Sequence, residues 1–151
     1  MTSEAVTQGS RHRTVLAAMW TGLAFTVLAA LYPFVDRATT HVLADHIRHG
    51  YPSYSAGEVD AAVTAYLVIL SVVGGLGLIS WLVTIRAVRA DRGWIRWAAP
   101  VVFVAAAGIT LAGLTVTDTS GEVGLAPLLG WLLVLPCLAG VVAVVGLWQR
   151  R

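Results

Sequence analysis

The chain has 151 residues, of which 58% are hydrophobic and 12% are charged, and its formal net charge is +2. Its mean hydropathy of +0.79 is typical of proteins that cross a membrane several times, and it excludes an ordinary soluble domain. No run of basic residues is long enough to indicate nucleic-acid binding.

Four apolar runs account for this hydropathy, and none of them contains Asp, Glu, Lys, Arg or His. As a helix rising ~1.5 Å per residue, each run can cross a hydrocarbon core of ~30 Å. The runs are residues 15–35, 61–85, 97–116 and 125–148. We therefore predict one all-α domain over residues 1–151, an integral membrane four-helix bundle. The first run is too long for a signal peptide and is interpreted as an uncleaved span.

The longest loop follows the first span, at residues 36–60. Its first half, residues 38–49, predicts a short helix lying on the membrane, with Val42, Leu43 and Ile47 toward lipid. Ser55 and Glu58 have the spacing of a capping box, which predicts the beginning of the second span.

Acidic and histidine side chains recur in this loop at the spacing of a helix. Asp45 lies four residues from both His41 and His49, and His46 lies three residues from His49, a pattern that can hold zinc or another divalent cation. Glu58 and Asp60 could complete the ligand set. The alternative is the polar face of an interfacial helix. Both interpretations stay open, and a divalent metal is the only cofactor that the sequence suggests.

The loop between the second and third spans is basic. Arg86, Arg89, Arg92 and Arg96 lie there beside Trp94, which supports the hypothesis of a site for anionic lipid headgroups. The alternative is that these arginines only orient the chain in the membrane.

The arginines also predict the topology. Eight of the ten basic residues, all arginines, lie near the chain ends or in the second loop, and only Arg37 and Arg48 lie in the first loop. The positive-inside rule then places both termini in the cytoplasm, with the protein in the plasma (inner) membrane. Tryptophans favour the membrane boundary, and on the cytoplasmic side we expect Trp81, Trp94, Trp97 and Trp148.

Small residues are expected to pack the spans, because lipid tails leave no hydrophobic force between helices. Gly22, Thr26 and Ala30 share one face of the first span, and Ala105, Gly108 and Ala112 share one face of the third.

The residues missing from the spans argue against several activities. Without an acid or base inside a span, proton-coupled transport lacks its usual carrier, and without histidine there, haem binding lacks its ligand. The single cysteine, Cys137, excludes a disulfide relay. The sequence therefore predicts no catalytic residue.

Four short segments carry a resemblance to known proteins. Residues 51–60 (YPSYSAGEVD), 118–122 (DTSGE), 128–131 (LLGW) and 135–140 (LPCLAG) resemble those of small four-span membrane proteins of high-GC bacteria. The chain is also similar in architecture to the DoxX-like four-span class. The resemblance implies a fold and no activity.

These observations favour a non-enzymatic membrane protein with a structural, interaction or lipid-binding role. Its expected partners are the bilayer and either further copies of itself or another membrane protein. The alternative is an outer-face metal sensor or membrane enzyme built on the 36–60 loop. A third hypothesis is a small-molecule pocket between the helices near Tyr66, Trp131 and Pro136.

Overall fold

The structure, a computed structural model, describes the backbone of residues 2–149 and the side chains of residues 9 and 12–149. It has five helices in this range: α1 (Thr2–Ala38), α2 (Val42–Gly50), α3 (Ala56–Arg89), α4 (Ile95–Thr115) and α5 (Pro127–Trp148). Four of them are long and apolar enough to span a membrane, namely His12–Ala38 of α1 and the whole of α3, α4 and α5. The prediction of four apolar spans in an all-helical chain is confirmed.

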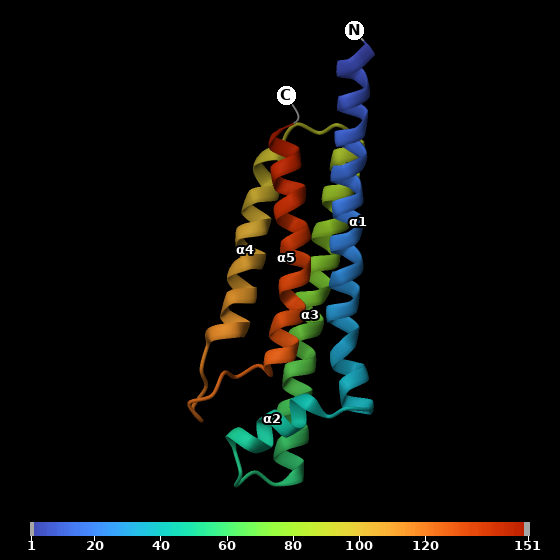
Figure 1. Cartoon of the computed structure of the whole chain (residues 1–151). Helices are drawn as coiled ribbons and strands as arrows, with labels where there is room; N and C mark the ends of the chain where they lie inside the picture. Colours follow the sequence, from blue (N-terminus) through green and yellow to red (C-terminus); the bar gives the residue numbers. More distant parts are fainter. Residues whose placement is uncertain (1, 150–151) are drawn as a thin grey trace.

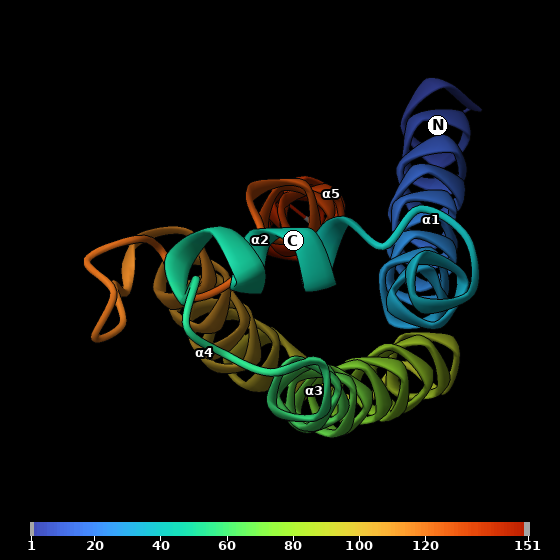
Figure 2. The same cartoon turned by 90° about the horizontal axis from the view of Figure 1, so that it is seen from below.

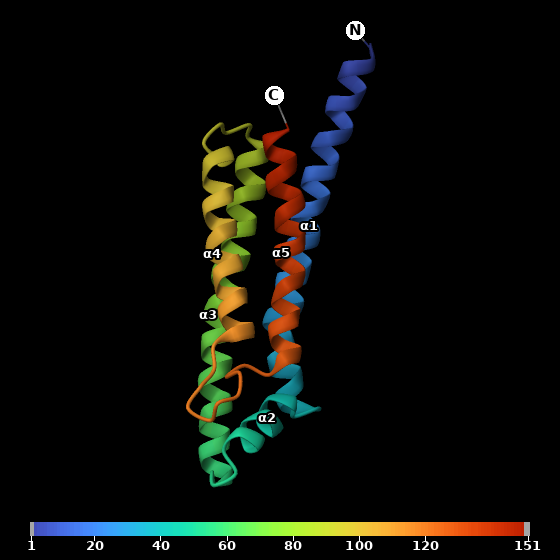
Figure 3. The ribbon, with the colours of Figure 1, turned by 60° about the vertical axis from the view of Figure 1, so that its left-hand side comes forward.

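The long helices run side by side, and both ends of the chain lie at the same end of the molecule (Figure 1). The loop between α3 and α4 lies at this end too, whereas α2 and the 116–126 loop lie at the other. The beginning of α1 extends past the other helices and leans away from them (Figure 3). The side chain of Arg11 and residues Arg150 and Arg151, which entered the topology prediction, lie outside the described part.

The helix α3 begins five residues before the apolar run, because the capping box places its N-cap at Ser55. The Ser55 hydroxyl accepts from the Glu58 backbone N–H at 3.3 Å, and the Glu58 carboxylate accepts from the Ser55 backbone N–H at 2.7 Å. The predicted capping box is confirmed. At ~1.5 Å per residue, the 34 residues of α3 are ~50 Å long, so α3 extends well beyond a ~30 Å hydrocarbon core.

The contact between α1 and α3 uses the small-residue face predicted on the first span. A Cβ at Gly74 would meet the Ala30 Cβ at 2.7 Å, and a Cβ at Gly77 would meet the Thr26 Cγ2 at 3.0 Å. At Gly22 an added Cβ would overlap the Trp81 ring. Close backbone approach at these positions therefore depends on the missing side chains.

The small-residue face predicted on the third span has a different environment. Ala105, Gly108 and Ala112 are exposed, and a Cβ added at Gly108 would meet nothing within 4 Å. The helix α4 instead packs on α5, where Phe103 lies against Gly140 and Leu114 against Gly130. The expectation that this face packs the span against another is not met within residues 12–149.

The short helix α2 forms where the sequence predicts one, but its apolar face was wrongly assigned to lipid. Leu43 and Ile47 are only 1% and 5% exposed, and they pack with Val63 of α3, with Leu125 just before α5 and with Leu129 in its first turn. Seen from below, α2 lies across the end of α5 (Figure 2). Because α3 extends so far, its apolar side chains lie beside α2 and cover the apolar face of α2. In an isolated interfacial helix this face would contact lipid.

Asp36 was assigned to the first loop, and the structure corrects this assignment. It lies in the last turn of α1, is 1% exposed, and accepts hydrogen bonds from the Thr40 hydroxyl, the Val42 N–H and the Leu43 N–H. Its own backbone carbonyl accepts from the N–H of His41 at 2.8 Å. Asp36 therefore connects the end of α1 to the beginning of α2.

Two separate hydrophobic clusters hold the assembly together, one near each end. The cluster near the chain ends includes Val15, Met19, Ile85, Ile95 and Leu147. The cluster near α2 includes residues of α2, of the first half of α3 and of the beginning of α5. The two clusters share no residue, so the middle of the molecule is packed differently from its ends.

Candidate functional site

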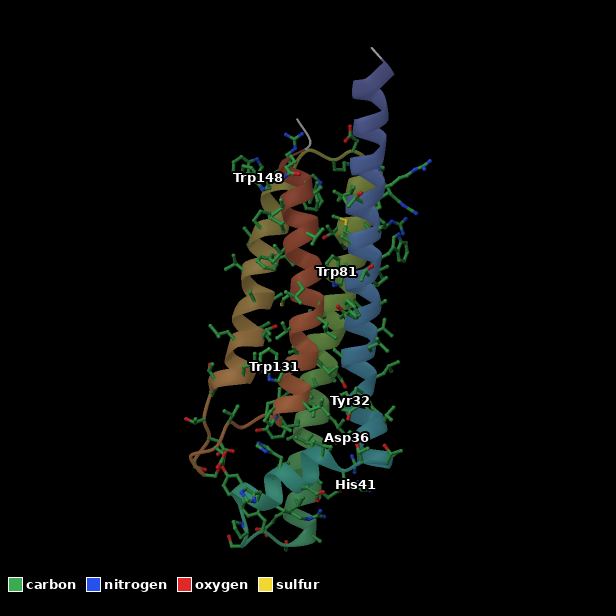
Figure 4. All side chains as sticks on the ribbon, in the orientation of Figure 1. Tyr32, Asp36, His41, Trp81, Trp131 and Trp148 are labelled. Carbon is green, nitrogen blue, oxygen red and sulfur yellow. The ribbon has the colours of Figure 1, made fainter. Side chains whose placement is uncertain are left out.

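The acidic and histidine residues predicted to bind metal do not converge in the structure. His41 precedes α2 in a left-handed conformation (φ 54°), and Asp45 forms an ion pair with Arg48 at 2.8 Å. Asp60 forms another ion pair, with Arg37, also at 2.8 Å, while Glu58 is used in the capping box. Figure 4 shows Asp36 and His41 at the α2 end of the molecule.

His46 has a role that the sequence did not indicate. Its Nε2 lies 2.7 Å from the Val123 carbonyl oxygen, and because a carbonyl only accepts, Nε2 carries the proton and donates. His46 thereby connects α2 to the 116–126 loop. Among the side chains described, no three His, Cys, Asp or Glu residues are grouped so that they could hold a metal ion. The metal site stays a prediction without support from this geometry.

The 116–126 loop forms a compact turn. Thr117 pairs with Val123 in an isolated antiparallel bridge, and Gly121 takes the positive φ of 85° that closes the turn. The Ser120 hydroxyl and backbone N–H donate to Asp118, and these hydrogen bonds lower the pKa of that carboxyl. The Tyr51 and Thr119 hydroxyls lie 2.8 Å apart and add a second contact to the α2 region.

A cavity with the character of a binding site lies between the two hydrophobic clusters. It is a cavity of about 400 Å³, within the ~300–1,000 Å³ range of small-molecule sites in proteins. Its lining runs from Met19 to Ala30 on α1, from Leu70 to Thr84 on α3, from Ala99 to Thr110 on α4 and from Leu133 to Leu147 on α5.

The cavity exists because the helices pair unevenly. The helix α1 packs against both α3 and α5, and α4 packs mainly on α5, whereas α3 and α5 have no close backbone contact in the described part of the chain. Leu76 of α3 and Val102 and Ile109 of α4 line the cavity and are also 59%, 41% and 45% exposed. The cavity therefore opens at the side of the molecule, between α3 and α4.

The polar groups of the lining are already hydrogen-bonded. The Trp81 Nε1–H donates to the Thr26 hydroxyl at 3.0 Å, and that hydroxyl donates to the Gly22 carbonyl at 2.8 Å. The remaining hydroxyls, from Ser80, Thr84 and Thr110, each donate to the carbonyl four residues earlier. No buried side-chain nitrogen or oxygen lacks a partner within the described residues. The cavity thus offers an apolar surface without a free donor.

The sequence located this site only in part. Of the three residues named for a pocket, only Pro136 lines the cavity; Tyr66 packs in the cluster near α2, and Trp131 is 63% exposed. Trp81 lines the cavity and donates a hydrogen bond to Thr26 of α1 (Figure 4), and its expected place at the membrane boundary stays a prediction. Trp81 lies four residues, about one helical turn, before the apolar run ends at residue 85, so its position in the run gave no signal for a place in the cavity.

The arginines proposed for lipid headgroups lie at the end of the molecule that carries the chain ends. Arg86, Arg89 and Arg92 are exposed, as is Arg96, and the Arg89 guanidinium lies 5.8 Å from the centre of the Trp20 ring. Such a pair resembles an interfacial cation–π contact. Headgroup binding at these residues stays a prediction.

Comparison with known proteins adds no relative. No protein-family model, curated protein or solved structure matches the chain. The resemblance to four-span proteins of high-GC bacteria therefore stays an expectation, and the function is argued from the site alone.

Proposed function

We propose that this protein is a non-enzymatic membrane protein that binds an apolar molecule of the bilayer inside its helix assembly. The cavity between α3 and α4 is the observation that carries the proposal, because it is large enough for a ligand and opens toward the region that lipid occupies. Its lining carries no charged side chain and no histidine, so the side chains that most often perform acid–base chemistry are missing there.

Filling the cavity is expected to abolish binding. Ala106 lines the cavity and Ala112, on the same helix, does not, so Ala106→Phe fills the site and Ala112→Phe is its matched control. We expect native mass spectra of the wild type and of Ala112→Phe to retain a lipid-sized mass that Ala106→Phe has lost. A ligand at about 100 times its Kd stabilises a protein by about 2.7 kcal/mol, and this stabilisation should also be absent in Ala106→Phe. Equal retention by all three proteins would contradict the proposal.

We further propose that the chain ends and the α3–α4 loop face the cytoplasm, as the arginine distribution favours. The test uses a Cys137→Ser background with one new cysteine, either Ser53→Cys before α3 or Gly93→Cys in the α3–α4 loop; both sites are exposed. A membrane-impermeant thiol reagent should label Ser53→Cys on intact cells, and Gly93→Cys only after the cells are opened. The opposite pattern would invert the topology.

A further inference from the structure

We infer that the ligand of this cavity is a single hydrocarbon chain of a bilayer lipid, which enters sideways between α3 and α4 and leaves its polar headgroup outside. This inference rests on the proposed function and specifies the chemical class and the entry route of the ligand.

The length of the cavity suits a hydrocarbon chain. Its lining on α4 covers Ala99 to Thr110, about 16 Å along the helix axis at ~1.5 Å per residue. The lining side chains are mostly apolar, and the cavity volume is about 400 Å³. A long apolar site of this kind fits an extended hydrocarbon chain lying along the helices.

The hydrogen bonds of the lining support a hydrocarbon rather than a polar group. A carbonyl, carboxylate or phosphate buried in the cavity would need a donor, and leaving a buried polar group unpaired is costly. The Trp81 N–H and the hydroxyls of Thr26, Ser80, Thr84 and Thr110 already donate within the protein. Such a group would therefore have to break an existing bond, whereas a hydrocarbon chain breaks none.

The two hydrophobic clusters define the entry route. One cluster joins α1, α3, α4 and α5 near the chain ends, and the other joins α2, α3 and α5 at the opposite end. A ligand moving along the bundle axis meets one of them. The exposed lining residues Leu76, Val102 and Ile109 instead mark the side of the cavity, so the chain reaches it from within the bilayer.

Fluorescence of Trp81 tests this inference directly, because bromine atoms quench an indole only on contact. In a variant whose other five tryptophans are changed to Phe, Trp81 is the only reporter, and the vesicles contain phosphatidylcholine brominated in the middle of its acyl chains. We expect clear quenching of Trp81. Adding Ala106→Phe should reduce this quenching by at least half, and Ala112→Phe should leave it unchanged. Unquenched Trp81, or quenching that is insensitive to Ala106→Phe, would overturn the inference.

A second measurement uses the wild-type protein, so its result does not depend on whether the single-tryptophan variant folds. Phosphatidylcholine with a diazirine at the end of one acyl chain should crosslink to residues that line the cavity, such as Phe103 and Val144. Crosslinks confined to outward-facing residues such as Val104 and Leu111 would overturn the inference. If a polar-headed molecule is retained in native mass spectra while both chain probes fail, the proposed function stands and only the chain assignment is wrong. If no ligand is retained, both fail.

Discussion

Asp36→Ala is expected to lower the free energy of unfolding by roughly 2–4 kcal/mol, since a donor left buried and unsatisfied costs ~1–3 kcal/mol. The Asp36 carboxylate accepts from the Thr40 hydroxyl and from the backbone N–H groups of Val42 and Leu43, and it is 1% exposed. Alanine removes the acceptor from all three. Reversible unfolding in mixed detergent and SDS micelles, followed by circular dichroism, measures the change.

Asp45→Ala is the matched control for this prediction. Asp45 is exposed on α2 and pairs with Arg48 at 2.8 Å, and exposed ion pairs contribute ~0–1 kcal/mol. Asp36→Asn should fall between the two, because its amide keeps one oxygen and places an NH₂ group near donors. If Asp36→Ala costs no more than Asp45→Ala, Asp36 does not support the junction of α1 and α2.

Gly22→Val is expected to destabilise the protein by ~1–3 kcal/mol, the usual cost of forcing extra carbon atoms into a packed interior. Its Cβ would overlap the Trp81 ring, and that ring is held in place by the hydrogen bond from Nε1 to Thr26 at 3.0 Å. A shift of the ring away from the added atoms would strain this bond. The same unfolding assay measures the loss.

Two further variants test the cause of this loss. Gly108→Val adds the same atoms where nothing lies within 4 Å, and it should change the stability by less than ~0.5 kcal/mol. In a Trp81→Leu background, Gly22→Val should cost clearly less, because the clashing ring is gone. Equal costs in both backgrounds would show that Gly22 is constrained by something other than Trp81.

The parts of the fold that sequence reasoning predicted are those set by local patterns. The hydropathy of each run defines a span, and the Ser55–Glu58 spacing defines the beginning of α3. The Gly22, Thr26 and Ala30 face also corresponds to a helix contact. These features depend on residues within a few turns of one another, so one sequence is sufficient to show them.

The features that escaped prediction depend on segments far apart in the chain. Leu43 and Ile47 have the same apolar face whether lipid or protein covers it, and the positions of α3 and of the beginning of α5 beside α2 decide between the two. His46 has the spacing of a metal ligand, yet it bonds to Val123, 77 residues away. The cavity arises from the missing contact between α3 and α5, and periodicity within a single helix does not show which helices pair.

The side opening of the cavity also determines the route by which a ligand can enter and leave the protein. A channel or carrier must offer its cargo a path from one aqueous face to the other, with polar groups that replace water along the way. Here the two hydrophobic clusters lie across that path, and the lining has no free donor. The hydrocarbon ligand that we propose would therefore exchange parallel to the membrane plane, between the interior of the protein and the surrounding leaflets. Its occupancy would therefore follow the composition of the bilayer, independently of solutes on either side.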